Sequence, residues 1–194
     1  MAGFRAVLDA CVLVPMVKAD VLLEFAHQGA YRPLWSDRIL GEVARAIPIA
    51  SAQRVRLEAG QRRVRRMNTI FEDAKVEDWE DLQEQLIGLP DPDDRHVVAA
   101  AIRGHASAIV TDNLKDFPNA ELGRWGLHAV DSDEFLLDLL DLNFRRGLGC
   151  LKAVSERRKN PPQEIANILD SLEVSGAPGF AFEARRLLDI SAEE

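Results

Sequence analysis

The sequence has little cysteine, no long apolar run and no excess of positive charge. Cys11 and Cys150 are its two cysteines, and neither belongs to a CxxC pair or a Cys/His cluster, which excludes a disulfide framework and a zinc site. No apolar run approaches the roughly 20 residues that a membrane-spanning helix needs. The apolar start of the chain is interrupted by Asp9 and has no small-residue cleavage site. We therefore expect a cytoplasmic protein without a signal peptide.

Length and composition predict one domain of ordinary size, 194 residues long and 47% hydrophobic, with room for a small appendage. The net charge of -8 is unlike that of a basic nucleic-acid-binding domain. Charge is nevertheless segregated along the chain. Residues 51–70 carry six arginines against one acid, residues 144–160 six basic residues against one acid, and residues 72–94 ten acids against one lysine. Each segment can be a solvated helix face or a binding surface.

Short apolar runs alternate with helical patterns along most of the chain. Strands are expected at 5–9, 34–36, 107–111 and 127–130, with a weaker one at 74–77. Helices separate these strands, which predicts an α/β fold with a parallel sheet of about five strands covered on both faces. From residue 143 onward the strand pattern ends and amphipathic helices follow. We therefore expect a domain over 1–142 and a helical extension over 143–194.

Acidic residues gather where the predicted strands end. Asp9 follows the first strand, and Asp112 and Asp116 follow the strand at 107–111. Glu42 borders the apolar stripe of the helix after the second strand. Parallel sheets bind ligands at the carboxyl ends of their strands, so these acids are candidates for one site.

Asp94 adds a further acid from the helix that LPDPDD opens. At 100° per residue it lies in the centre of the apolar stripe formed by Val97 and Ala101, so it faces the sheet, whereas Asp93 faces outward. Asp91 can act as the N-cap, with Pro92 at the first helical position. Capping explains Asp91 well, but it does not require an acid on the buried face.

Carboxylates buried together need cations, and sites made only of oxygen ligands suit Mg²⁺ or Mn²⁺. The matching chemistry is phosphodiester hydrolysis by metal-activated water, often with two ions about 3.5–4 Å apart.

Four motifs resemble one known family in their order and spacing. VLDACVLV, WSDRILGEVARAI, PDPDDRHVVAAAI and IVTDNLKDFP look like the PIN domain, and most like VapC-type toxins of bacterial toxin–antitoxin systems. The resemblance covers about residues 4–140. It implies a three-layer α/β/α fold and a Mg²⁺- or Mn²⁺-dependent endoribonuclease that cuts structured RNA such as tRNA or rRNA. A cognate antitoxin would silence it, in a homodimer or a toxin–antitoxin hetero-oligomer.

The resemblance also assigns residues. The acids that it places at the metal as catalytic residues are Asp9, Glu42, Asp94 and Asp116. Asp112 is an extra acid that can replace or assist Asp116 as a metal ligand, and Asn113 matches the polar residue of the same motif. Thr111, at the end of its strand, can hold a water or a phosphate.

Arginines of the 51–70 segment can supply the positive charge that an acidic site lacks. They are Arg54, Arg62, Arg63, Arg65 and Arg66. We expect them to bind RNA phosphates or the acids of the antitoxin. The extension over 143–194 can pack on the domain, form a dimer contact or receive the antitoxin.

Ala10 and Cys11 depart from the family pattern, which has Thr or Ser and then Asn after the first acid. This departure predicts weaker support for Asp9 and leaves open a non-catalytic PIN-like scaffold that binds RNA or protein. Cys11 is interpreted as a small buried residue rather than a nucleophile, and His96 as a surface residue. A phosphoacceptor domain of the receiver type is disfavoured, because that class needs a pair of acids after the first strand.

Overall fold

The computed structural model describes residues 3–50, 56–159 and 161–192. Residues 191 and 192 are described by their backbone alone. Within these ranges the strands form one parallel sheet in the order β2-β1-β3-β4. The strands are β1 (Arg5–Leu8), β2 (Arg32–Leu34), β3 (Ala108–Val110) and β4 (His128–Val130). Val7 of β1 pairs with Leu34 on one side and with Ile109 on the other. The central strands β1 and β3 are apolar and largely buried, as strands covered on both faces must be.

The predicted α/β class with a parallel sheet is confirmed, with four strands among the described residues instead of about five. The weak strand expected at 74–77 is a single parallel bridge between Trp35 and Lys75. It stays short because the 3-10 helix η1 (Glu72–Ala74) precedes Lys75 and because Asp78 turns the chain away with a φ of 55°.

The chain forms two compact units, one of residues 1–15 and 31–131, the other of residues 16–30 and 132–194. The first unit contains the sheet. Its remaining elements are α1 (Ala10–Leu13), α3 (Asp37–Ala50), α4 (Leu57–Ile70), η2 (Glu80–Gln85), η3 (Pro92–Asp94), α5 (Arg95–Arg103), η4 (Leu114–Asp116), α6 (Asn119–Leu122) and η5 (Gly123–Trp125). Helix α5 packs on β1 and β3, and α1 packs against α3.

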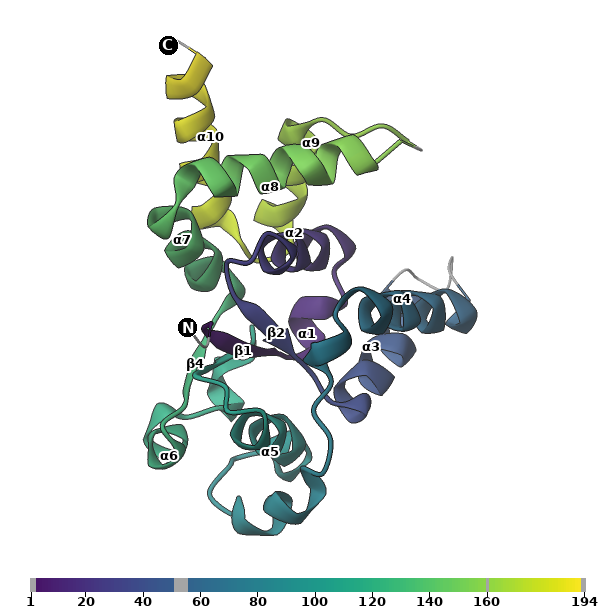
Figure 1. The fold of residues 1–194 in the computed structure, drawn as a ribbon, viewed down its shortest axis with the longest axis vertical. Helices are drawn as coiled ribbons and strands as arrows, with labels where there is room; N and C mark the ends of the chain where they lie inside the picture. Colours follow the sequence, from purple (N-terminus) through teal and green to yellow (C-terminus); the bar gives the residue numbers. More distant parts are fainter. Residues whose placement is uncertain (1–2, 51–55, 160, 193–194) are drawn as a thin grey trace. The chain divides into compact units, whose positions relative to one another are not determined.

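Helices α3 and α4 lie side by side (Figure 1). Helix α3 contains Pro48 and continues past it to Ala50. Pro48 has no N–H, so the Ala44 carbonyl lacks its usual helical donor. Gly60 of α4 packs at this point, where a Cβ would lie 2.4 Å from the Ala44 oxygen. Glycine is therefore required for the close approach of α4 to α3.

The second unit is helical, and its elements are α2 (Met16–His27), α7 (Ser132–Leu142), α8 (Phe144–Arg157), α9 (Ile165–Val174) and α10 (Pro178–Ala192). Helix α2 packs against α8 and α9, and the Phe25 ring meets the Phe180 ring edge-on at 6.1 Å. Asp133 accepts backbone hydrogen bonds at the start of α10 from Gly179 (2.8 Å) and Phe180 (2.7 Å). The helices expected after residue 143 are present, whereas the domain boundary at 142/143 stays a prediction. No described helix is both long and apolar enough to cross a membrane.

Candidate functional site

Asp9 lies directly after β1 and caps α1. It is 8% exposed, and its backbone N–H donates to the Val110 carbonyl of β3. One carboxylate oxygen accepts the backbone N–H of Ala10 at 2.6 Å. The other accepts the Thr111 hydroxyl at 2.7 Å and the Cys11 thiol at 3.1 Å. Three donors therefore fix the carboxylate of the first predicted metal ligand.

Thr111 and Cys11 join the ends of β1 and β3. Thr111 is fully buried, and its hydroxyl also accepts the backbone N–H of Asn113 at 3.2 Å. The Cys11 sulfur lies 3.4 Å from the Thr111 hydroxyl and accepts the backbone N–H of Asp112 at 3.3 Å. Burial, and then the charge of Asp9, raises the pKa of Cys11 to about 12, so the thiol is neutral and suits a donor better than a nucleophile. The weaker support expected for Asp9 is thus made up by Thr111 and Cys11.

Asp94 closes η3, is the N-cap residue of α5 and is half-buried. Burial raises its pKa to about 6, and the charges of three other acids add to the rise. These acids are Asp9, Asp91 and Asp116. The charges of Asp9 and Asp116, which lie on other elements, contribute to the pKa of Asp94. This is consistent with the inward orientation that helix periodicity predicts for Asp94. Asp93 faces solvent with a side chain 92% exposed, and Asp91 is the N-cap of η3, as predicted.

Asp116 closes η4 with a side chain that is 18% exposed. The Asn113 amide donates a short hydrogen bond to one of its carboxylate oxygens, and the Lys115 ammonium lies 4.0 Å from the same oxygen. Asn113 therefore orients Asp116. Asp112 is exposed and contributes a backbone N–H to Cys11. Because Asp116 is largely buried and oriented by Asn113 whereas Asp112 is exposed, the geometry favours Asp116 over Asp112 as the acid of the site.

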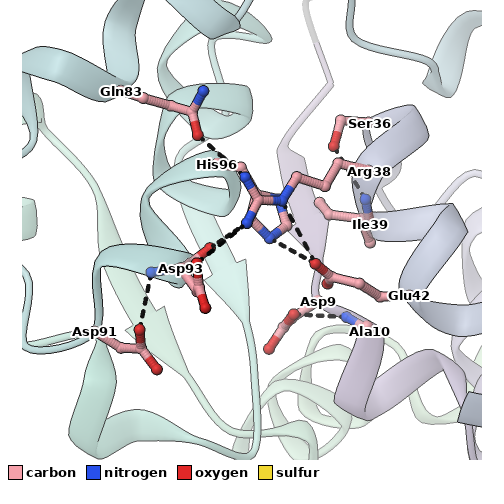
Figure 2. A network of polar contacts seen from close by, with 10 residues as sticks. All are labelled: Asp9, Ala10, Ser36, Arg38, Ile39, Glu42, Gln83, Asp91, Asp93 and His96. Atoms are coloured by element: carbon pink, nitrogen blue, oxygen red, sulfur yellow. Dashed lines mark hydrogen bonds and ion pairs between the residues drawn. The ribbon is translucent and has the colours of Figure 1, made fainter.

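Glu42 stands in a network of its own, shown in Figure 2, where Arg38 and His96 converge on its carboxylate. The His96 Nε2 lies 3.0 Å from Glu42 Oε1, and Arg38 Nε lies 3.7 Å from the same oxygen. Arg38 also reaches the Asp93 carboxylate (3.6 Å) and the Gln83 side chain (3.4 Å). Glu42 is thus held by Arg38 of α3 and His96 of α5, and Arg38 is in turn held by Gln83 of η2 and Asp93 of η3.

The interpretation of His96 as a surface residue is wrong, because its side chain is 2% exposed. Helix periodicity correctly placed His96 away from the stripe that faces the sheet. That opposite side of α5 is covered by η2, and the Trp79 ring lies 6.0 Å from the imidazole. His96 is therefore buried between α5 and the segment before it.

The donors of this site fit a hard divalent cation by their chemistry. All are carboxylate oxygens, which Mg²⁺ and Mn²⁺ prefer. Burial first, and then the charges of Asp9, Asp91 and Asp116, raise the pKa of Asp94, and a cation beside these carboxylates would offset both effects. Among the described residues, however, no three Asp, Glu, His or Cys side chains are arranged closely enough to hold a metal ion as they stand. Binding would have to draw the carboxylates together.

The predicted arginine surface divides into two parts. Arg62, Arg65 and Arg66 are exposed on α4. Arg63 is half-buried and donates to the Val14 carbonyl at 3.4 Å, which ties α4 to the end of α1. Arg54 lies outside the described residues. The exposed arginines therefore remain candidates for binding, whereas Arg63 has a packing role.

Models of known protein families match two parts of the chain. A family model described as PIN domain matches residues 5–115. The chain belongs to the PIN domain family. A second model, described as VapC50 C-terminal domain, matches residues 132–186 of this PIN protein. That match begins at Ser132, where the second compact unit resumes.

A curated relative is similar to part of the chain. Over 94 residues, this PIN protein is 42% identical to "Putative ribonuclease VapC50" of Mycobacterium tuberculosis (strain ATCC 25618 / H37Rv). The similar stretch covers 48% of this chain and 55% of the relative, so the chain spans about half the relative's length. No solved structure matches.

Cys11, Arg38 and His96 belong to the site although no sequence pattern assigned them to it. The signal for Arg38 was its position, one helical turn before Glu42 on the same face of α3. For Cys11 and His96 no local pattern was available, because their partners lie on distant segments.

Proposed function

We propose that this PIN protein is a Mg²⁺- or Mn²⁺-dependent endoribonuclease and the toxin component of a bacterial toxin–antitoxin system. One observation carries the proposal: Thr111 binds both the Asp9 carboxylate and the backbone N–H of Asn113, and the Asn113 amide binds Asp116, so acids that follow β1 and β3 share a site in a PIN domain. The charges of these two acids also contribute to the raised pKa of Asp94. The name of the Mycobacterium tuberculosis relative, which contains the word ribonuclease, supports the same class.

Each residue of the site has a role in this proposal. Asp9, Glu42, Asp94 and Asp116 hold the metal, and Asp112 lies nearby as an alternative to Asp116. Thr111 and Cys11 fix the carboxylate of Asp9, while Asn113 fixes that of Asp116. A bound divalent metal supplies a water of lowered pKa and neutralises charge on the phosphate. Hydrolysis would leave 5′-phosphate and 3′-hydroxyl ends.

Substrate and partners follow from the same family. Arg62, Arg65 and Arg66 would contact RNA phosphates, which would compensate for the repulsion between RNA and the acidic site. We propose structured RNA, such as tRNA or rRNA, as the substrate and a cognate antitoxin as the protein partner. A homodimer or a toxin–antitoxin hetero-oligomer in the cytoplasm stays the expected state.

A non-catalytic PIN-like scaffold that binds RNA or protein is the second candidate. One observation favours it: no preformed set of three metal donors occurs in the described part of the chain. This candidate predicts RNA or protein binding without cleavage.

The test is incubation of the purified protein with total bacterial RNA and Mg²⁺ or Mn²⁺, followed by mapping of the 5′ ends. Wild type is compared with Asp9→Asn, Asp94→Asn and the matched control Asp73→Asn, an exposed acid of η1. We expect discrete cuts by wild type and Asp73→Asn, and none by the other two variants or in EDTA. Folded wild-type protein that binds RNA but leaves it intact with every metal would establish the scaffold instead.

A further inference from the structure

We propose that His96 is a positioning residue that fixes the Glu42 carboxylate for metal binding. The inference rests on the proposed metal site and on the place of Glu42 in it. Glu42 has three rotatable side-chain bonds, and its side chain is 32% exposed. Without a partner it would sample several rotamers, at a cost in entropy when a metal orders it.

The contact between His96 and Glu42 is short and protected. His96 Nε2 lies 3.0 Å from Glu42 Oε1, and the imidazole side chain is 2% exposed. A carboxylate can only accept, so Nε2 must carry the proton of this hydrogen bond. Arg38 Nε approaches the same oxygen at 3.7 Å. Both donors use Oε1 and neither uses Oε2, which leaves the second oxygen for another partner.

The other ring nitrogen of His96 makes no hydrogen bond within the described residues, so Nε2 makes the polar contact of this imidazole. His96 Nδ1 is buried and has no hydrogen-bond partner among the described residues. A buried polar atom without a partner is costly, and an apolar side chain of similar size would avoid that cost beside Trp79. Stability alone therefore does not account for a histidine here, whereas fixing Glu42 does.

The contact between His96 and Glu42 lies close to the other proposed metal ligands. Glu42 lies on α3, and α3 packs against α1, whose N-cap is Asp9. His96 follows Asp94 by two residues, so the short stretch from the end of η3 to the start of α5 both offers an acid and holds another. Residues that orient a metal ligand typically change metal affinity or activity by 10–100-fold when they are removed.

The experiment compares two amides that differ in reach. His96→Gln keeps an N–H donor near the position of Nε2, whereas His96→Asn places its amide near Nδ1, away from Glu42. Mn²⁺ binding to metal-stripped protein is measured by calorimetry for both variants, for wild type and for Glu42→Gln with and without His96→Asn. Thermal unfolding checks each fold, and His128→Asn, on the exposed end of β4, is the matched control.

We expect His96→Gln to stay within about threefold of wild type and His96→Asn to bind Mn²⁺ about tenfold or more weakly. In the Glu42→Gln background, His96→Asn should cause no further loss, because the two residues act as one unit. Equal affinity in the Asn variant and wild type, or an undiminished loss in the Glu42→Gln background, would overturn the inference. If the Asn variant does not fold, His96→Leu replaces it with the same expectations. Wild type that binds Mn²⁺ but cuts no RNA would refute the proposed nuclease and leave the role of His96 standing.

Discussion

At the scale of single residues, Asp94 combines a structural cost with a proposed function. Its pKa is raised to about 6 by burial and by neighbouring acids, so ionisation at neutral pH opposes folding of the metal-free protein. A raised pKa of the folded state gives stability that is full below the unfolded value of about 4 and is lost as the pH rises through about 6.

Asp94→Asn should therefore stabilise the metal-free protein at about pH 7 and change little at about pH 4. A shift of about two units sets an upper limit of about 3 kcal/mol, which solvent screening of a half-exposed group reduces to about 1 kcal/mol, or about 2–4 °C in melting temperature. Scanning calorimetry in EDTA measures this, with Asp73→Asn, an exposed acid of η1, as the control. Lower stability of Asp94→Asn at neutral pH would contradict the expected sign. The same variant should lose Mn²⁺ affinity, because a ligand is removed.

Sequence periodicity could predict the orientation of Asp94 but not the surroundings of His96. One turn of helix fixes which side chains share a face, and Asp94 shares the face that packs on β1 and β3. Periodicity says nothing about what covers the opposite face. His96 is buried because η2 and Trp79 pack against α5. This packing between separate segments cannot be read from the spacing of residues within one helix.

At the scale of elements, α4 is the candidate surface for RNA. Its exposed arginines are carried on a helix that Gly60 brings close to α3, the helix that also holds Glu42. Replacing Arg62, Arg65 and Arg66 by Gln should weaken RNA binding and lower the slope of log affinity against log salt by about 2, since each phosphate that is no longer neutralised on a single strand lowers it by about 0.7.

Filter binding or fluorescence anisotropy over a salt series measures that slope. The charge-matched control replaces Arg145, Lys152 and Lys159, which are exposed cations of the second basic segment. An equal fall of the slope in the control would mean that RNA is attracted by net charge and not by α4.

The elements themselves were predictable wherever a strand or helix is locally specified. Buried apolar runs placed β1, β3 and β4 within a residue at either end, whereas β2 lies at Arg32–Leu34 and shares only Leu34 with the strand expected at 34–36. Helical spacing identified the helices between the strands. The expectation at 74–77 failed because strand formation there depends on the edge of β2, where the pairing with Trp35 ends after one bridge. Helix α3 continues through Pro48 to Ala50, although the missing N–H leaves the Ala44 carbonyl without its helical donor, so a proline near the end of a helical pattern did not mark the end of the helix.

At the scale of the whole molecule, the two compact units are not consecutive stretches of sequence. Helix α2 comes early in the chain but packs with α8 and α9. Its face includes Val21, Leu22 and Phe25, all fully buried. A boundary at 142/143 follows from the disappearance of strand patterns, which cannot reveal that an early helix belongs with late ones.

A chain that ends at Leu142 tests this difference. It would retain α2 but lack α8, α9 and α10, so the apolar face of α2 would lose its cover, at about 1.5–3 kcal/mol for each large side chain exposed. We therefore expect residues 1–142 alone to aggregate or to bind a hydrophobic dye, and to melt far below the full chain, as judged by size-exclusion chromatography and calorimetry. A monomer of residues 1–142 that unfolds cooperatively at the temperature of the full chain would instead establish a self-sufficient domain with a dispensable extension. Because α2 contributes neither an acid nor an arginine of the proposed site, any loss of Mn²⁺ binding in the shortened chain would reflect its folding and not the removal of a ligand.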